Sequence, residues 1–153
     1  FLTWLEANID DVTAKNLDAC EECVAKAVQL KAAIVEQDER DELVRLHLNF
    51  GHTVGHAVEA YSKFALSHGK AVSIGMAAEM RMTDAPGENR ILQLLERIGM
   101  PTAIPGDYPK EKLWELMKHD KKNVGDSVRV AVPKKLGAAE VRTIEREDFD
   151  RLY

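Results

Sequence analysis

Two histidines four positions apart are the first candidates for chemistry in this sequence. His52 and His56 lie in the string Asn49-Phe-Gly-His52-Thr-Val-Gly-His56. Residues three or four apart share one face of a helix, so both imidazoles would point to the same side. Two imidazoles at this spacing can reach one divalent ion. The pair alone supports a metal site only weakly, because surface histidines and hydrogen-bonded core histidines occur at the same spacing.

Other polar residues extend the same face. Arg45, Asn49 and Glu59 fall on this stripe at helical spacing. A stripe that faces a core would be apolar, and a solvent-exposed stripe would rarely carry two histidines with glycines between them. The pattern therefore predicts a polar wall that faces a cavity. His47 lies off this stripe, and we interpret it as structural.

Several single residues are weaker candidates. His68 precedes a glycine, where a turn could aim a metal ligand, but a lone histidine at such a place is more often part of the turn. His119 and the pair Lys121-Lys122 follow a helical segment, where cations complement the helix dipole. Lys31 resembles an ordinary solvated lysine. None of these residues indicates a function by itself.

The elements that would position these residues are mostly helices. Apolar residues at helical spacing predict two helices within 1–35, separated near Asn16, and further helices over 43–64, 70–82, 88–98 and 110–118. The segment 67–69 is expected to be a turn. Alternation at 128–132 predicts a strand, and 141–144 is its expected partner. We therefore expect a mainly α-helical domain of about six to eight helices with one small β-hairpin near the C-terminus.

Composition excludes several classes of protein. The chain has 153 residues and a formal net charge of -5, and a net acidic domain without a basic stripe is a poor nucleic-acid binder. No apolar run approaches the ~20 residues of a membrane span. Two cysteines do not make a secreted disulfide framework. We expect a cytoplasmic protein that binds neither nucleic acid nor membranes, and a fragment of something longer, because it begins without Met.

Taken together, these motifs resemble the C-terminal half of the 3-dehydroquinate synthase family. The matching residues are Asp38-Glu39-Arg40, Arg45, Leu48-Asn49-Phe-Gly-His52-Thr-Val-Gly-His56-Ala-Val-Glu59, His68-Gly69-Lys-Ala-Val-Ser-Ile-Gly75-Met76, Asp120-Lys121-Lys122, Val130-Ala-Val-Pro133 and Gly137. Their order and spacing hold over nearly the whole chain. The resemblance implies that residues 1–153 are one helical C-terminal domain, the α-helical half of a two-domain enzyme. The N-terminal NAD-binding domain would then be absent from this chain.

The resemblance also implies a role for each motif residue. His52 and His68 are similar to two of the three protein ligands of a catalytic zinc or cobalt ion. The third ligand is a glutamate of an Ala-Glu-x-x-Lys motif that would lie upstream of Phe1. This corrects the spacing argument, which pairs His52 with His56. The residues similar to catalytic and substrate-binding positions are His56, Lys31, Arg45 and Asn49, with Lys121 or Lys122 as a further substrate contact.

The family's activity is implied in the same way. Such enzymes are carbon–oxygen lyases of the shikimate pathway of aromatic amino acid biosynthesis. They convert 3-deoxy-arabino-heptulosonate 7-phosphate, a phosphorylated sugar acid, to 3-dehydroquinate and phosphate, using catalytic NAD and a divalent metal. The expected partners are this substrate, the chain's own N-terminal NAD-binding domain and a second copy in a homodimer. The chain alone is expected to be inactive and to bind zinc poorly.

Two alternatives share the architecture. A metal-dependent polyol or alcohol dehydrogenase would not need Lys31, Arg45 and Asn49 to hold a phosphate. Another sugar-phosphate cyclase would often differ at the substrate contacts, whereas Asn49, His56 and the lysine pair are all present. Both observations favour the dehydroquinate branch.

Overall fold

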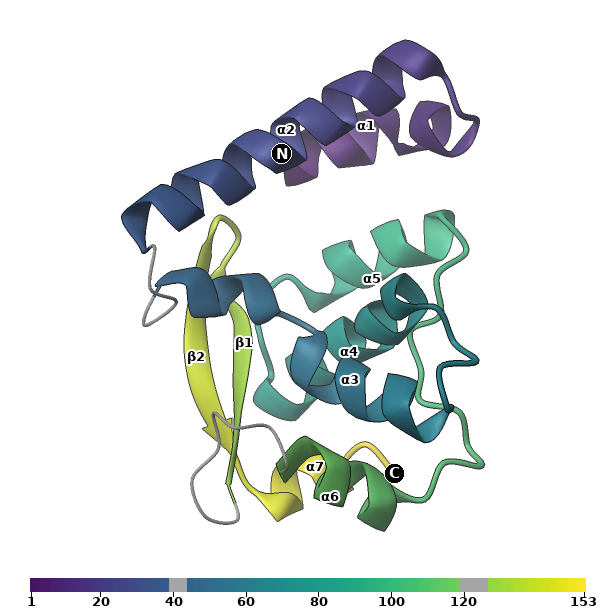
Figure 1. The fold of residues 1–153 in the computed structure, drawn as a ribbon, viewed down its shortest axis with the longest axis vertical. Helices are drawn as coiled ribbons and strands as arrows, with labels where there is room; N and C mark the ends of the chain where they lie inside the picture. The colour runs from purple at the N-terminus through teal and green to yellow at the C-terminus, as the bar shows by residue number, and fades with distance from the viewer. Residues whose placement is uncertain (39–43, 119–126) are drawn as a thin grey trace.

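The computed structural model describes residues 1–38, 44–118 and 127–153. Its elements in chain order are α1 (Leu2–Thr13), α2 (Leu17–Gln37), the short 3-10 helix η1 (Val44–Asn49), α3 (His52–Tyr61), α4 (His68–Thr83), α5 (Glu88–Arg97), α6 (Lys110–Lys118), β1 (Val128–Lys135), β2 (Ala138–Ile144) and α7 (Arg146–Asp150). The predicted mainly helical domain with one C-terminal hairpin is confirmed (Figure 1).

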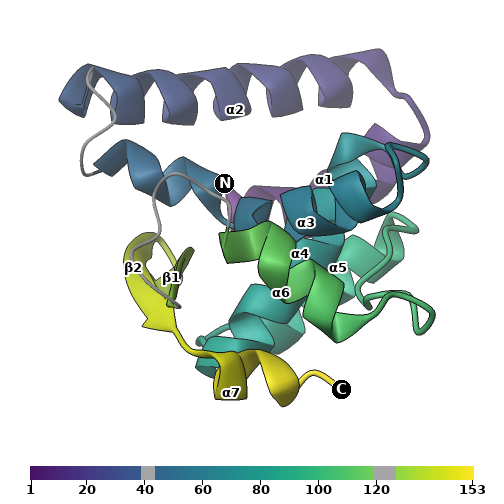
Figure 2. The same ribbon diagram turned by 60° about the horizontal axis from the view of Figure 1, so that its bottom comes forward.

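The first two helices form an antiparallel pair along one edge of the molecule (Figures 1 and 2). The side chain of Asn16, near which the two helices were expected to separate, accepts a hydrogen bond from the Ala19 amide at 3.1 Å and caps the N-terminus of the second helix. On the inner side, α1 contacts α5, where the Arg90 guanidinium donates to both carboxylate oxygens of Glu6 at 2.6 Å. Because α1 and α2 lie at the edge, α3 and α4 are at the centre of the fold (Figures 1 and 2).

The helices α3 and α4 pack in backbone contact. Gly75 of α4 lies so close to Gly51 that a Cβ added at Gly75 would stand 1.9 Å from the Gly51 carbonyl oxygen. Glycines at these places are therefore required by the packing. Around this contact lies the core, whose largest fully buried apolar side chains are Phe149, Ile74, Met80, Met82, Leu113, Met117, Ile144, Val54, Val58, Val128 and Val130.

The hairpin β1–β2 covers one side of this core. Its strands are antiparallel, with Val128 opposite Ile144 and an irregularity between Pro133 and Lys135. Val128 and Val130 are buried and Arg129 between them is exposed, which is the alternation expected of a strand with one face on the core. The short helix α7, which was not predicted, follows directly; a reciprocal capping box between Glu145 and Asp148 begins it.

Two predictions about elements were wrong. The continuous helix over 43–64 is instead η1 followed by α3, because Gly51 adopts a left-handed conformation with φ of 78° and becomes the N-cap of α3. His68 lies not in a turn but at the first position of α4, after Ser67. Residues 45 and 49 therefore do not share one continuous helix with residues 52, 56 and 59.

None of the helices in the described ranges has both the length and the apolar character needed to cross a membrane.

Candidate metal centre and adjoining cavity

Three imidazoles gather where α3 meets α4. His52, His56 and His68 each offer a ring nitrogen, and these nitrogens all lie within 4.8 Å of one another. The ring centroids are 5.3 Å apart for His52–His56 and His52–His68, and 5.8 Å apart for His56–His68. Two nitrogens on one tetrahedral zinc are roughly 3.3 Å apart, since Zn–N is about 2.0–2.1 Å. Small side-chain rotations would close the cluster onto one ion.

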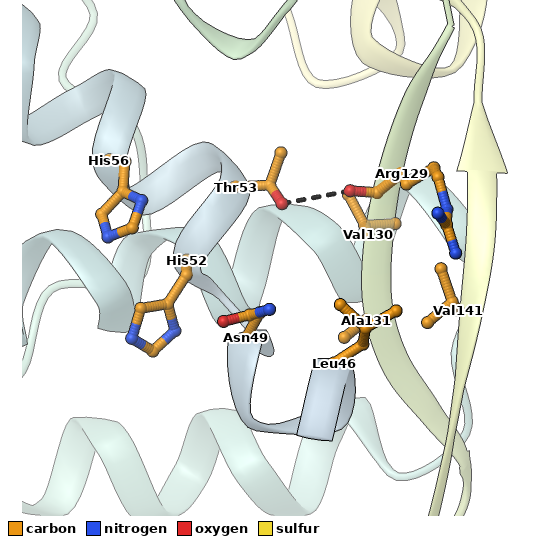
Figure 3. Close-up of a pocket in the computed structure, with 9 residues that line it drawn as sticks. All are labelled: Leu46, Asn49, His52, Thr53, His56, Arg129, Val130, Ala131 and Val141. Carbon is orange, nitrogen blue, oxygen red and sulfur yellow. Dashed lines mark hydrogen bonds between the residues drawn. The ribbon is translucent and has the colours of Figure 1, made fainter. Parts of the chain in front are cut away.

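Two helix N-termini position these rings. His52 is the first residue of α3 and His56 lies one turn further, so both project from the same side of that helix (Figure 3). His68 is the first residue of α4 and approaches from the neighbouring helix. The sequence distance between His56 and His68 is closed because α3 and α4 are antiparallel neighbours in backbone contact.

The environment of His52 suits a neutral imidazole. Its Nδ1 lies 3.2 Å from the Phe50 carbonyl oxygen, so the tautomer that donates there leaves Nε2 available. Burial lowers the pKa of His52 below its usual value, and the nearby His56 and His68 lower it further, while the Phe50 carbonyl opposes them. A metal ligand must be unprotonated, so a lowered pKa favours binding of a cation.

His68 has a carboxylate partner. Its Nδ1 lies 3.2 Å from Oε2 of Glu59, a residue of α3. The Glu59 side chain is 17% exposed and the His68 side chain 55% exposed, so the carboxylate is sheltered while the ring reaches outward. A carboxylate on Nδ1 of an imidazole fixes the ring's orientation and leaves Nε2 for a metal ion.

A cavity of about 350 Å³ adjoins the imidazoles. Its lining joins α3, η1 and both strands of the hairpin (Figure 3): Leu46, Asn49, His52, Thr53, His56, Arg129, Val130, Ala131 and Val141. The Thr53 hydroxyl donates to the Arg129 carbonyl oxygen at 3.1 Å and thereby ties α3 to β1. The volume suits a small molecule. Polar residues lie at both ends of the cavity: the two imidazoles at the α3 end and Arg129 at the hairpin end (Figure 3).

Comparison with known proteins connects this geometry to a family. The family model described as 3-dehydroquinate synthase C-terminal matches residues 1–123, which include all three imidazoles. The chain belongs to this family.

Curated relatives carry the same name. A 3-dehydroquinate synthase of Pelotomaculum thermopropionicum is 39% identical over 156 residues, which is 97% of this chain and 42% of that protein. The synthases of Shewanella frigidimarina and Geobacillus thermodenitrificans are each 36% identical over 97% of this chain, and 44% and 42% of their own lengths are covered. The chain thus spans less than half the length of these relatives.

Some residues that the 3-dehydroquinate synthase resemblance selects meet in the structure. Asn49, His52 and His56 line the cavity, and His68 joins them in the cluster. Lys31 is exposed on α2, and neither it nor Arg45 is part of the described cavity lining; the Arg45 amide donates to Asp38 at 3.0 Å. The two lysines at 121 and 122 lie outside the described residues.

Sequence reasoning missed the buried acid of this synthase-family domain. Glu79 of α4 is fully buried, and its carboxylate accepts from the amides of Gly51 at 2.7 Å and Val54 at 3.1 Å. Burial raises its pKa to about 8, while these backbone hydrogen bonds pull in the opposite direction. A single acid among the alanines and methionines of the predicted helix over 70–82 was the available signal, since a buried carboxyl needs partners.

Proposed function

We propose that this chain is the metal- and substrate-binding part of an enzyme that converts 3-deoxy-arabino-heptulosonate 7-phosphate to 3-dehydroquinate and phosphate. The observation that carries the proposal is the three-imidazole cluster beside a cavity, in a chain of the 3-dehydroquinate synthase C-terminal family. The reaction would place the protein in the shikimate pathway as a carbon–oxygen lyase, in the cytoplasm.

His52 and His68 would hold the metal, a zinc or cobalt ion. Both rings have their Nδ1 within 3.2 Å of an acceptor, one on a backbone carbonyl and the other on a carboxylate. This arrangement leaves both Nε2 atoms for one cation and matches the outer partners that ligating histidines have. When bound, the ion would supply Lewis acidity to a substrate oxygen. A third protein ligand would come from outside this chain, as the family resemblance implies.

His56 would move protons at the mouth of the cavity. Its ring is exposed, lies 5.3 Å and 5.8 Å from the other two ring centroids, and faces the cavity beside Asn49. An imidazole that is not needed by the metal can accept a proton from a substrate hydroxyl and return it later. Asn49 can donate to and accept from neighbouring hydroxyls and so orient the sugar acid.

The substrate's phosphate and carboxylate need cations. Lys31 and Arg45, with Lys121 or Lys122, are the candidates that the resemblance supplies. Arg129 is a further cationic residue of the cavity lining. A net charge of -5 does not oppose this role, because a few local cations are enough to hold an anion. Closure against a second domain would bring such scattered groups together.

The rest of the catalytic apparatus would lie in another domain. NAD, as a reversible hydride acceptor, would bind mainly to an N-terminal domain, as the family resemblance implies; the chain itself spans 44% and 42% of the length of two of its relatives. That domain, and a second copy of the enzyme in a homodimer, are the proposed partners.

A chimeric enzyme tests this function. The C-terminal portion of the Geobacillus synthase is replaced by residues 1–153, and phosphate release from the heptulosonate phosphate is followed with NAD and zinc. We expect release by the chimera and by its His47→Ala variant, and a loss of at least about a hundredfold in His68→Ala. A folded, zinc-loaded chimera that releases no phosphate but reduces NAD with polyols would instead indicate a dehydrogenase.

A further inference from the structure

The first turn of α3 lacks a capping side chain of its own. Its N-cap is Gly51, which has no side chain to offer, and the first amides of a helix have no partner within the helix. In most helices a Ser, Thr, Asp or Asn at the N-cap accepts from these amides. Here the turn that presents His52 would be left with unpaired amides in a buried place.

Glu79 supplies the missing acceptors from the neighbouring helix. Its Oε2 accepts from the Gly51 amide at 2.7 Å and its Oε1 from the Val54 amide at 3.1 Å. These amides lie on either side of His52, one before it and one after it. The two hydrogen bonds therefore fix the backbone that determines the direction of the His52 side chain.

The packing of α3 on α4 makes such a link necessary. The contact is formed at glycines, where a Cβ at Gly51 would lie 2.7 Å from the Val72 carbonyl oxygen and one at Gly55 would lie 3.0 Å from that of Ala71. Glycine contacts allow a close approach, but they offer no side chains that interlock against rotation or sliding. Glu79 is a directional contact across the same interface.

The two helices joined in this way carry all three imidazoles. His52 and His56 belong to α3, and His68 begins α4, the helix of Glu79. We propose that Glu79 is a positioning residue. From α4 it caps the N-terminus of α3, and this contact holds His52 in register with His68. This inference rests on the proposed metal site, since its consequence is the geometry offered to the ion.

Three variants of the full chain separate positioning from stability. Glu79→Met keeps an unbranched side chain in the buried space and removes both acceptors. Glu79→Gln keeps one acceptor oxygen and is the conservative rescue. Met80→Ala is the matched control, because Met80 is fully buried on the same helix and its truncation leaves the Glu79 contacts in place.

Two readouts are measured for each variant, beside its melting temperature. One is the affinity for Co²⁺ with its visible absorption spectrum. The other is the set of histidine ring ¹⁵N shifts in the metal-free chain. Glu79→Met is expected to weaken Co²⁺ binding about tenfold and to shift the His52 ring signals away from the tautomer that donates to Phe50. Glu79→Gln should recover most of the Co²⁺ affinity and most of the wild-type His52 ring signals. Met80→Ala should keep its Co²⁺ affinity within about twofold of wild type despite its lower melting temperature.

Either of two results would overturn the inference. One is unchanged Co²⁺ affinity and unchanged His52 ring signals in Glu79→Met. The other is a loss of Co²⁺ affinity in Met80→Ala as large as that in Glu79→Met, when both variants are measured under conditions where they are equally stable. A wild-type chain that binds no Co²⁺ would contradict the proposed metal site, and the ring shifts would then decide the role of Glu79 by themselves.

Discussion

At the scale of single residues, hydrogen-bond partners separate the two proposed metal ligands from the third imidazole more clearly than spacing does. His52 and His56 have the spacing of a ligand pair, yet it is His52 and His68 whose Nδ1 atoms have an acceptor within 3.2 Å. The family motif selects the same two. Spacing along one helix could not reveal His68, because its approach depends on how α4 packs against α3.

Glu59 provides a test at this scale. We expect Glu59→Ala to weaken Co²⁺ binding by the chain about tenfold, because the His68 ring loses the carboxylate that orients it. Isothermal titration measures the effect, and Glu96→Ala, an exposed acid on α5, serves as the control. Equal Co²⁺ affinities in Glu59→Ala and wild type would show that the Glu59 carboxylate does not orient His68 for metal binding.

The buried Glu79 could be suspected but not placed from the sequence. A glutamate between Ala78 and Met80 indicates an acid in an apolar helix, and such an acid needs partners. Its partners are backbone amides that become available only because Gly51 interrupts the helix. No pattern of side chains encodes that pairing.

At the scale of elements, the glycines determine how the site is built. The periodicity over 43–64 is helical throughout, but the left-handed conformation of Gly51 begins a new helix at His52. The structure shows close backbone contacts at Gly51, Gly55 and Gly75, where an added Cβ would lie 3.0 Å or less from backbone atoms of the other helix. Apart from α7, which was not predicted, and the first turn of α4, the remaining helices and the hairpin lie where their hydrophobic patterns predict them, because those patterns are local.

Gly75 makes the close contact testable. Gly75→Ala would drive a Cβ against the Gly51 carbonyl oxygen, so we expect it to destabilise the chain by about 1–3 kcal/mol or more. Gly69→Ala is the matched control on the same helix, because the nearest atom to its added Cβ is Met100 Cε at 3.7 Å. Urea denaturation compares them. If both variants lost stability equally, loss of glycine itself, and not the helix contact, would be responsible.

The pH dependence of stability tests the burial of Glu79. Its pKa is about 8 in the folded chain against an ordinary value of 4.5, so the folded chain retains a proton that the unfolded chain releases. Stability contributed by this group is therefore complete below about pH 4.5 and is lost as the pH rises toward 8. We expect the free energy of unfolding of wild type relative to Glu79→Gln to fall over this range.

Urea titrations at half-unit pH steps measure that difference. Glu96→Gln, which changes an exposed acid, should leave the pH profile of wild type unchanged. Parallel profiles for wild type and Glu79→Gln would mean that Glu79 ionises in the folded chain as easily as in the unfolded one.

At the scale of the whole molecule, two of the three clustered imidazoles are exposed to solvent. The His56 and His68 rings are exposed, and Lys31 is exposed on a helix outside the described cavity lining. The chain also covers only 42–44% of the length of its curated relatives. Both observations fit a metal and substrate site completed by a second domain.

We therefore expect no phosphate release from the heptulosonate phosphate by residues 1–153 alone, with NAD and zinc present. The chimera with the Geobacillus N-terminal portion is the positive control in the same colorimetric phosphate assay. Turnover by the chain alone at the rate of the chimera would contradict the division of the site between two domains.

The most direct test of the metal centre is a Co²⁺ titration of four chains followed by visible absorption: wild type, His52→Ala, His68→Ala and His47→Ala. His47 lines a second, mainly apolar cavity with Phe50 and is not one of the three clustered imidazoles, so it serves as the control. We predict one Co²⁺ per chain for wild type and His47→Ala, with modest affinity, and a loss of at least about tenfold in both cluster variants. Equal binding by all four chains would contradict the assignment of His52 and His68 as ligands.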